Sequence, residues 1–398
     1  MSAVRSPYTR AAWFYGASRV EPGKDHVFSQ LDEAKHTKRR QQMAAGVRFH
    51  SPPFSPTHLT SPYQYSGKEN TFLESSIDKH VQELLNLIRS KYLSTKEQAR
   101  PMDLARKIQF FTLDVISSIG FGQPFGDLNS DSDIDSYIHS GEQALGFVTF
   151  STATGLTSVL HWPWLARLLG PSEKDKRGLG KMMATARRLI DSRLTQFKGI
   201  GEGSDMLASF LRHGLSRDDL FTESILQILA GSDTTATAIR CTMLYLISHP
   251  RVYSKLQAEV DEHVASGAVM NIVSDAEAKK LRYLMAVIHE GLRIHPPVTD
   301  EVPKVVPKGG DTVMVEGKEV FLPGGTNIGY CVLGLNRNRE IFGEDVEQFR
   351  PERWLIEDGE RLNAMKKTTD LIFGYGKYQC LGKPIAWLEI SKVIFEVR

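Results

Sequence analysis

The sequence is poor in cysteine, with three in 398 residues, and has no surplus of charge of either sign. So few cysteines exclude a disulfide-stapled scaffold and fit a reducing compartment. The formal net charge of +2 gives no electrostatic reason to expect nucleic acid. No run of about 18 apolar residues predicts a transmembrane helix, and the N-terminal segment lacks an apolar stretch of signal-peptide length. What is present, 41% hydrophobic and 24% charged residues, is a globular composition.

Apolar residues recur at spacings of three and four over much of the first 300 positions, which is typical of amphipathic helices. No Pro-, Gly- or Ser-rich linker divides the chain, so 1–398 is predicted to be a single domain, mainly α with a small β portion. The expected segments are an irregular 1–25, a helix-rich body over 26–299 with a loop at 48–75 and Pro250 closing its longest helix, short strands over 300–330, an irregular meander and cysteine loop over 340–382, and a final helix over 383–397.

The segment FGYGKYQCLG, from Phe373 to Gly382, places a lone cysteine between glycines just ahead of a predicted helix. Gly376 and Gly382 have no Cβ and allow the backbone to approach a flat ligand. The free N–H groups and positive dipole end of the helix are expected to stabilise a thiolate at Cys380. Such a thiolate suits a soft or borderline metal, and haem iron is one. The alternative is that Cys380 is only a small buried hydrophobe.

The string AGSDTT, residues 230–235, lies inside the longest predicted helix. Glycine and consecutive threonines are poor helix-interior residues. Threonine hydroxyls that bond back to the preceding turn loosen a helix, which predicts a bulge beside a functional site. Asp233 followed by Thr234 also pairs a carboxylate with an alcohol, as a proton relay requires. A Thr-rich patch merely tolerated by packing is the alternative.

Two further pairs share helix faces. Glu290 and Arg293 are three residues apart, so their side chains meet, although alone they indicate no more than a surface ion pair. His36 and Arg40 are four apart in a basic helix that is expected to end at Gly46. Their shared face is either an anion pocket or a solvated basic surface.

Taken in order, these motifs resemble those of the cytochrome P450 monooxygenases, and the resemblance covers nearly the whole chain. It is strongest to the fungal microsomal branch, including pisatin-demethylase-like enzymes, and it implies the family's helical haem-binding fold. FRPERW, between the ExxR motif and the cysteine loop, completes the series and implies a buried structural triad of Glu290, Arg293 and Arg353. One position departs from the family. Tyr378 stands where an Arg or His usually faces a haem propionate.

The resemblance implies haem b as the cofactor and assigns roles to the candidate residues. Cys380 is the implied proximal thiolate ligand of the haem iron, and Asp233 and Thr234 are implied to deliver protons to iron-bound dioxygen. The implied haem contacts are Gly231, Phe373, Gly376 and Gly382 along the cofactor, and His36, Arg40, Lys304 and Lys377 at its propionates.

The implied activity is insertion of one oxygen atom of O2 into a small lipophilic substrate, in secondary metabolism or detoxification. Electrons are expected from a separate NADPH–cytochrome P450 reductase, because the chain has no flavin or nicotinamide fingerprint. Candidate docking residues for an acidic partner are Lys35, Lys38, Arg39 and Lys383. Two alternatives stay open. One is a catalytically dead relic that serves at most as a haem-binding or partner-binding helical scaffold. The other is a haem-thiolate isomerase or dehydratase, against which the intact Asp233–Thr234 pair argues.

The resemblance also implies the cytoplasmic face of the endoplasmic reticulum membrane. Residues 144–170, rich in aromatic and aliphatic side chains, are either core and loop or a substrate-channel lid that touches membrane. Cys241 and Cys331 are expected only to pack. Only 18 residues follow Cys380, and His36 lies near the start. We therefore expect a domain trimmed at both ends, without the family's anchor, so that a cytoplasmic location stays open.

Overall fold

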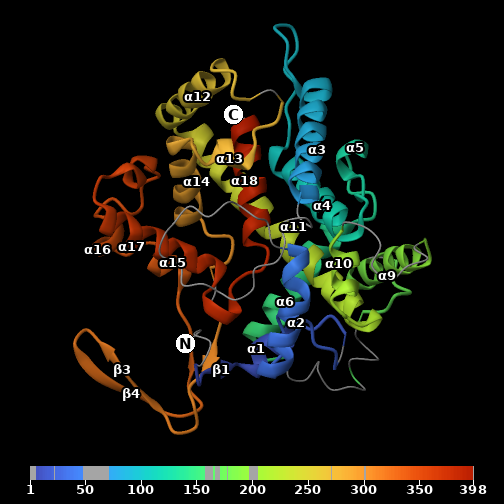
Figure 1. Cartoon of the computed structure of the whole chain (residues 1–398), viewed down its shortest axis with the longest axis vertical. Coiled ribbons are helices and arrows are strands. Elements are labelled where there is room, and N and C mark those ends of the chain that lie inside the picture. Colours follow the sequence, from blue (N-terminus) through green and yellow to red (C-terminus); the bar gives the residue numbers. More distant parts are fainter. Residues whose placement is uncertain are drawn as a thin grey trace.

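The computed structural model describes residues 6–21, 23–47, 71–156, 165, 171–176, 178–196, 205–269, 271–299 and 302–397. They form a helical body with two small antiparallel sheets, as the sequence predicts (Figure 1). Helix α11 (Arg217–Ser248) runs through the body and packs against α4 (Leu104–Phe121), α14 (Arg282–Ile294) and α18 (Lys383–Val397). Helix α3 (Thr71–Leu87) closes this core against α4 and α18.

The other described helices lie around this core. They are α1 (Ala12–Ala17), α2 (Glu33–Val47), α5 (Asp127–Ser130), α6 (Tyr137–Ala153), α9 (Gly178–Gln196), α10 (Met206–Arg212), α12 (Pro250–Ala265), α13 (Asp275–Ala278), α15 (Val332–Leu335), α16 (Arg339–Phe342), α17 (Gly359–Asp370), the π-turn η1 (Ile88–Tyr92), and the 3₁₀ turns η2 (Pro351–Leu355), η3 (Leu371–Phe373) and η4 (Gly376–Tyr378).

Local sequence sets both ends of the long helix α11. The Ser216 hydroxyl accepts the N–H of Asp219 at 3.2 Å as an N-cap, and Asp218 and Asp219 add negative charge to the first turn. The helix ends at Ser248, and Pro250 begins α12 as its first residue. A proline has no N–H to continue the α11 ladder but fits the first position of a new helix. The predicted stop at Pro250 is confirmed.

Two glycines let helices approach α11 closely. A Cβ on Gly231 would lie 2.9 Å from Cδ1 and Cγ1 of Ile116 in α4. A Cβ on Gly291 in α14 would lie 2.9 Å from the Cβ of Thr242 in α11. Neither position has room for a methyl group without a shift of its neighbour. These contacts fix α4 and α14 against the helix that carries the predicted relay.

The larger sheet joins the start of the described chain to the segment 304–328. Strands β1 (Thr9–Arg10), β2 (Lys304–Val305) and β5 (Asn327–Ile328) pair antiparallel in that order, and Arg10 lies opposite Lys304. The second sheet is a hairpin of β3 (Asp311–Val315) and β4 (Lys318–Leu322) that projects from the body (Figure 1). The register of β1 on β2 matters most for function, because it brings two basic side chains together.

Three local expectations are wrong. Residues 1–25 contain β1 and α1 rather than irregular structure. The meander contains α17, whose sequence has too few apolar residues to show helical periodicity but is capped by the Asp358 side chain, which accepts the N–H of Arg361 at 3.0 Å. Gly46 does not end its helix, since α2 continues to Val47. The missing side chain there allows close packing, because a Cβ would lie 2.9 Å from Cε1 of Phe210.

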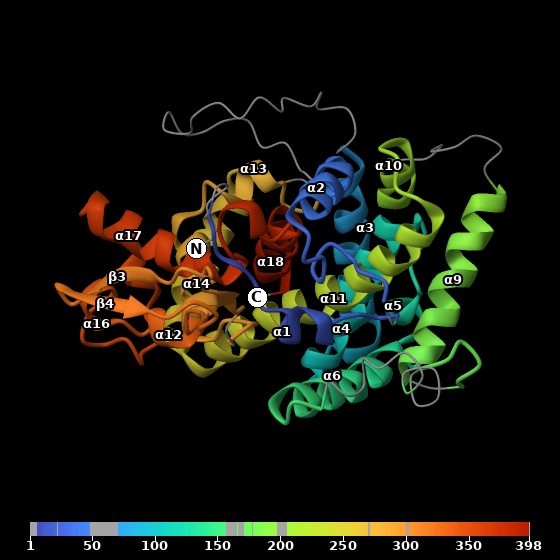
Figure 2. The same cartoon turned by 90° about the horizontal axis from the view of Figure 1, so that it is seen from below.

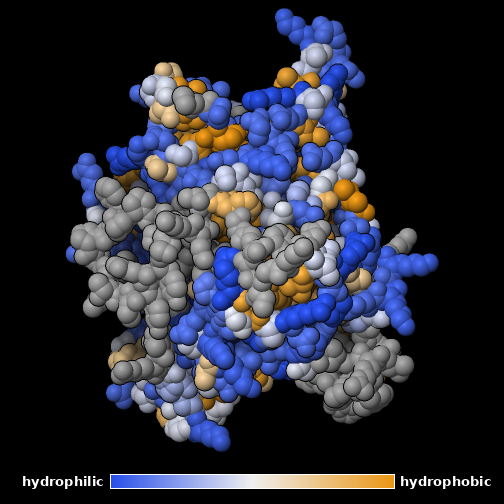
Figure 3. Space-filling view, turned by 45° about the vertical axis from the view of Figure 1, so that its right-hand side comes forward, coloured by the Kyte–Doolittle hydropathy of each residue, from blue (hydrophilic) through white to orange (hydrophobic). Residues whose placement is uncertain are grey.

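Exposed apolar side chains gather in two places. Helix α6, at the lower edge of Figure 2, exposes Leu145, Phe147 and Phe150, and the β3–β4 hairpin exposes Met314 and Phe321. These α6 side chains do not form core, although residues 157–164 and 166–170 of the predicted lid lie outside the described residues. Figure 3 shows a face that is mostly hydrophilic, with hydrophobic residues in small patches. Among the described residues, no helix is both long and apolar enough to cross a bilayer.

Candidate haem site

The cysteine loop folds back on itself ahead of α18. The N–H of Cys380 donates to the carbonyl oxygen of Phe373 at 2.6 Å. Gly374 and Gly376 take positive φ values of 70° and 64°, which glycine adopts without strain. The Lys383 ammonium lies 5.3 Å from the centre of the Phe373 ring. The loop therefore presents Cys380 three residues before the first residue of α18.

The Cys380 thiol faces open space beside a missing side chain. The residue is exposed to solvent, and a Cβ on Gly382 would meet Cys380 Sγ at 3.8 Å and no other atom of the described residues within 4 Å. Although one side of the residue is open, desolvation by the protein packed around the rest of it raises the pKa of Cys380, whereas the N–H groups of Gly382 and Lys383 lower it. The helix terminus thus acts in the predicted direction, but desolvation is larger, so a cation must supply the remaining stabilisation of a thiolate. A flat group that carries a metal fits this cradle.

Basic side chains gather beside the thiol. His36 is buried, and its Nδ1 has no hydrogen-bond partner in the part of the chain that the structure describes. Burial, and then the charges of Arg10, Arg40, Lys304 and Lys377, lower the pKa of His36 to about 3, so the ring is neutral at physiological pH. Arg40 also lowers the pKa of Cys380. The thiol and these five residues, which we call the basic cluster (Arg10, His36, Arg40, Lys304 and Lys377), therefore belong to one site.

Tyr378 lies between these cations rather than replacing one. Its ring centre is 3.5 Å from the Lys304 ammonium and 4.5 Å from the Arg10 guanidinium. Its hydroxyl donates to Glu33, and Lys377 pairs with the same carboxylate at 3.0 Å. Burial and the charge of Arg10 lower the pKa of Lys304 to about 7. The Glu33 carboxylate therefore contacts both Tyr378 and Lys377 at the edge of the cluster.

The donor set fits the anionic carboxylates of haem. Lys304 donates to the Tyr15 hydroxyl at 2.9 Å and is buried at the point where β2 meets β1.

The sequence did not predict Arg10, Tyr15 and Glu33 as members of this site. A two-residue strand gives no periodicity, and β1 at residues 9–10 pairs with β2 at residues 304–305, far away in sequence. Only the aromatic residues that flank Arg10 over 8–15 offered a signal.

The predicted relay residues lie on an unbroken helix. The hydroxyl of Thr234 donates to the carbonyl oxygen of Ala230 at 2.8 Å, as the sequence suggested, yet α11 remains α-helical throughout. The expected bulge is wrong, because the back-bond is made within regular helix geometry. Asp233 contacts Gln109 and Arg240. Gly231 faces α4 at the position that a Cβ would occupy, so the lack of a side chain allows the two helices to pack closely. The predicted contact of Gly231 with haem stays a prediction.

Glu290 lies at the centre of a buried network behind the cysteine loop. Its carboxylate receives both Nε and Nη2 of Arg293, at 2.9 and 2.8 Å, and Nε of Arg353 at 2.9 Å. The indole N–H of Trp354 donates to it at 2.9 Å. All four residues are buried. The network thus holds one negative charge between two guanidinium groups.

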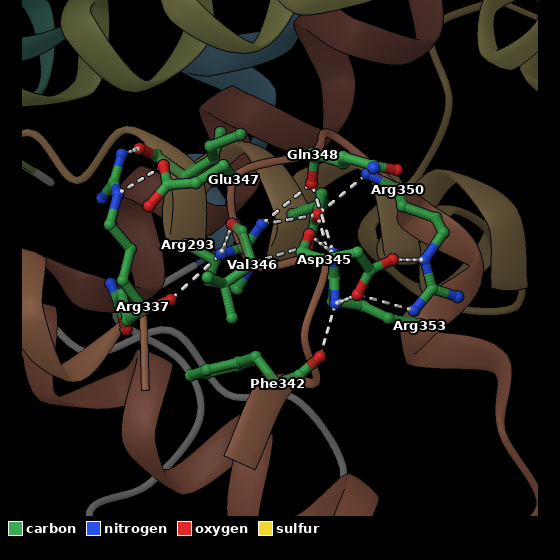
Figure 4. A network of polar contacts seen from close by, with 12 residues as sticks. Arg293, Arg337, Phe342, Asp345, Val346, Glu347, Gln348, Arg350 and Arg353 are labelled. Carbon is green, nitrogen blue, oxygen red and sulfur yellow. Dashed lines mark hydrogen bonds and ion pairs between the residues drawn. The ribbon is translucent and has the colours of Figure 1, made fainter. Parts of the chain in front are cut away.

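The two arginines bind the meander as well. Arg353 donates to the Phe342 carbonyl at 2.6 Å and pairs with Asp345 at 3.1 Å, and Arg293 donates to the Val346 carbonyl at 2.8 Å (Figure 4). Hydrogen bonding from Arg350 and the charge of Arg353 lower the pKa of Asp345 to about 2. Asp345 and Trp354 were missed, since neither belongs to a periodic segment.

Comparison with known proteins decides the family. Residues 9–397 match the protein family described as Cytochrome P450. The chain belongs to the cytochrome P450 family. Over its whole length it is 40% identical to Cytochrome P450 monooxygenase ABA1 of Pyricularia oryzae, of which it spans 74%. It is 35% identical, over the same shares, to Cytochrome P450 monooxygenase aba1 of Botryotinia fuckeliana. It is 32% identical over 98% of its length to Cytochrome P450 monooxygenase abl1 of Leptosphaeria maculans, spanning 65% of that protein.

This cytochrome P450 is accordingly an oxidoreductase of the monooxygenase type.

The predictions for two side chains, Arg39 and Cys331, need correction. Arg39 is no free docking cation, because it pairs with Asp219 and, at 3.3 Å, with the buried Glu223. Cys331 is exposed rather than packed, and its Sγ accepts the N–H of Gly334 at 3.3 Å as the N-cap of α15. Cys241 is half-buried.

Lys35 and Lys38 of this cytochrome P450 are exposed, whereas Lys383 pairs with Asp370 at 3.0 Å. Of the four candidate docking residues, Lys35 and Lys38 present exposed charges, and Lys383 shares its charge with Asp370. Their joint role in binding a partner stays a prediction.

Proposed function

We propose that the chain is a haem-thiolate monooxygenase that inserts one oxygen atom of O2 into a small lipophilic substrate, with Cys380 as the axial thiolate of haem b. The proposal depends above all on the open face of the Cys380 thiol, which has amide N–H groups behind it and the basic cluster beside it. The fungal relatives named as monooxygenases support a place in secondary metabolism. Detoxification of lipophilic compounds uses the same chemistry.

Haem, when bound, would supply the activation of dioxygen. The residues of this chain hold it and move protons. Cys380 would hold the iron, and Phe373, Gly376 and Gly382 would line the same side of the cofactor. The basic cluster would bind the two carboxylates. His36 contributes as a neutral ring, so its part is a hydrogen bond rather than a charge.

Asp233 would take protons from water and pass them to the Thr234 hydroxyl. The Asp233 side chain is 36% exposed, so water reaches it, whereas the Thr234 hydroxyl bonds back into the helix and is held in place. Glu290, Arg293 and Arg353 would act structurally. They fix the meander from which the cysteine loop emerges and touch neither substrate nor cofactor in this account.

Electrons would come from NADPH through a separate reductase. Lys35, Lys38 and Lys383 are the candidate contacts for an acidic partner surface, with Arg39 removed from that set by its internal ion pairs. The test is a Lys35→Glu/Lys38→Glu variant that keeps its haem spectrum. Slower NADPH oxidation with a raised Michaelis constant for the reductase would support this docking face, and an unchanged Michaelis constant would reject it.

Association with the endoplasmic reticulum surface is the proposed location. The exposed apolar side chains of α6 and of the β3–β4 hairpin support contact with lipid. Flotation of the purified protein with phosphatidylcholine vesicles tests this. Recovery in the floating fraction, reduced by Phe147→Ser/Phe150→Ser, is expected, and recovery only in the dense fraction would reject it.

The activity is tested by haem content and oxygen labelling. The purified protein should contain one haem per chain and, with NADPH, a reductase and labelled O2, should place one labelled atom in an oxidised product from a lipophilic compound panel. A protein that purifies largely without haem, and takes up none when it is added, would be the catalytically dead relic. Haem-loaded protein that transforms a substrate without labelled oxygen would be an isomerase or dehydratase.

A further inference from the structure

Three side chains form a closed ring between α4 and α11. Gln109 Nε2 donates to Oδ1 of Asp233 at 3.3 Å, and Arg240 Nη2 lies 3.5 Å from the same oxygen. Arg240 Nη1 donates to Oε1 of Gln109 at 3.4 Å. Each member of the ring therefore contacts the other two. We call Gln109 and Arg240 the Asp233 clamp.

The clamp is anchored from two helices. Gln109 lies in α4, and its side chain is only 7% exposed, so its amide has little freedom to move. Arg240 lies two turns beyond Asp233 on α11, and its Nη2 also donates to the Thr237 hydroxyl at 2.7 Å. The close approach of α4 to α11 at Gly231 sets the distance across which Gln109 reaches.

A glutamine suits position 109 because an amide offers one donor and one acceptor. Its N–H binds the carboxylate while its oxygen binds the guanidinium. A glutamate there would repel Asp233, and a leucine would leave both partners without their contact. The residue type is therefore matched to a carboxylate and a cation at once.

The clamp contacts only one oxygen of the carboxylate. Both contacts of Asp233 fall on Oδ1, and no residue that the structure describes bonds to Oδ2. A carboxylate held by one oxygen cannot rotate freely about its terminal bond. The second oxygen is left in a fixed direction with access to solvent.

We propose that Gln109 and Arg240 are positioning residues for proton delivery, which hold Asp233 by Oδ1 so that Oδ2 alone exchanges protons. In this step water, as hydronium, gives a proton to Oδ2. The carboxyl then gives that proton to Oγ1 of Thr234 while the hydroxyl releases its own proton to the acceptor in the site, so Asp233 becomes a carboxylate again and Thr234 stays a neutral hydroxyl. The inference rests on the proposed relay role of Asp233 and adds the residues that orient it.

A double-mutant cycle tests the clamp. The variants are Gln109→Leu, Arg240→Met, Arg240→Lys, Asp233→Asn and Asp233→Asn/Arg240→Met, each loaded with haem and assayed for NADPH oxidation with a reductase and dodecanoic acid as lipophilic probe. Rates are measured in H2O and D2O. Arg217→Met is the matched control, because Arg217 is exposed on the same helix and pairs only with Asp191 among the described residues.

We expect Asp233→Asn to slow turnover about 100-fold. Each clamp variant should slow it about tenfold, with a larger solvent isotope effect, while the ferrous carbon monoxide spectrum and the unfolding temperature stay as in the parent. Arg240→Lys should restore part of the rate. Adding Arg240→Met to Asp233→Asn should cause no further loss, since the clamp acts through Asp233. Arg217→Met should turn over normally.

Three results would overturn the inference. If Asp233→Asn is slow but both clamp variants keep the parental rate and isotope effect, the clamp is wrong and the relay stands. If Arg240→Met slows the Asp233→Asn protein further, Arg240 acts by another route. If Asp233→Asn itself is unaffected, the relay role fails and the clamp with it. If Gln109→Leu does not fold, the half-exposed Arg240 variants decide the question alone.

Discussion

Arg353 donates from Nε to Oε1 of Glu290 at 2.9 Å, across 63 residues of sequence, where neither side chain is more than 2% exposed. This contact joins the helix α14 to the segment η2 that leads into the cysteine loop. A charge pair so fully removed from water is costly to break, because Glu290 would keep only Arg293 and Arg353 only Asp345 as charged partners. The position of the segment that leads into the cysteine loop, and so of Cys380, therefore depends on this ion pair.

The variant Glu290→Gln tests that ion pair. The substitution keeps the shape but takes the carboxylate partner away from the buried Arg293 and leaves Arg353 with Asp345 alone, so the free energy of unfolding should fall by about 3–5 kcal/mol, measured by urea denaturation. Glu352→Gln is the control, since Glu352 pairs with Lys255 at a half-exposed site and should cost at most about 1 kcal/mol. Equal losses in the two variants would argue against the role given to Glu290.

Arg10→Met tests the part of the basic cluster that the sequence reading missed. Loss of one charged donor should weaken haem binding roughly tenfold, about 1.5 kcal/mol, measured by haem transfer to apomyoglobin. Arg19→Met, which removes a cation paired with Asp25 at 2.7 Å in the same segment, should leave transfer unchanged. Arg10→Lys should retain part of the affinity. Haem transfer that is as slow in Arg10→Met as in the parent would remove Arg10 from the propionate site.

His289 gives a pH dependence with a defined sign. Its ring lies 4.9 Å from that of Trp354 and 5.0 Å from that of Trp387, and burial, with smaller contributions from Lys366 and Lys383, lowers its pKa to about 3. The unfolded chain therefore binds a proton between about pH 6.5 and 3 that the folded chain does not. Stability should fall as pH falls through that window, by at most about 1.4 kcal/mol per pH unit.

His289→Phe should keep the aromatic contacts and remove this dependence. The free energy of unfolding, measured from pH 7 to pH 4, should then decline less steeply in the variant than in the parent. His139→Phe, at an exposed histidine, should decline like the parent. Parallel curves for His289→Phe and the parent would show that the ring is not desolvated as described.

Gly231→Ala tests the contact between α4 and α11. The added methyl group would press on Ile116, 2.9 Å away, and should cost about 1–3 kcal/mol of unfolding free energy. Gly120→Ala, in α4 with nothing within 4 Å of the added Cβ, should be neutral or slightly stabilising. Ile116→Val should relieve part of the cost in the double variant. A neutral Gly231→Ala would show that the helices have room to separate.

Much of the fold was predictable because amphipathic helices show in the sequence as apolar residues at spacings of three and four. The stop at Pro250 and the pairing of Glu290 with Arg293 follow from neighbours within a turn or two. Arg10 could not be placed, since its position opposite Lys304 depends on a two-residue strand pairing across the chain. Gln109 was missed for the same reason, since its partner Asp233 is 124 residues away. Asp345 has partners only five and eight residues away, Arg350 and Arg353, but it stands in no periodic segment and in no motif of its own.

The state of Cys380 was only half predictable. A cysteine before a helix implies stabilising N–H groups, and those of Gly382 and Lys383 do lower its pKa, but the opposing desolvation by the folded loop is a tertiary effect. Arg39 was mispredicted for a similar tertiary reason. Its basic sequence neighbours predicted an exposed docking residue, but its partners, Asp219 and Glu223, lie 180 or more residues away.

The central claim is that Cys380 binds haem iron as a thiolate, and the absorption spectrum of the reduced carbon monoxide complex tests it most directly. Wild type, Cys380→Ser and Cys331→Ser would be loaded with haem, reduced and exposed to carbon monoxide. The account predicts the red-shifted Soret band of thiolate-ligated iron in wild type and in Cys331→Ser, and its loss in Cys380→Ser with haem still bound. A red-shifted band that persists in Cys380→Ser, or that is missing from haem-loaded wild type, would contradict it.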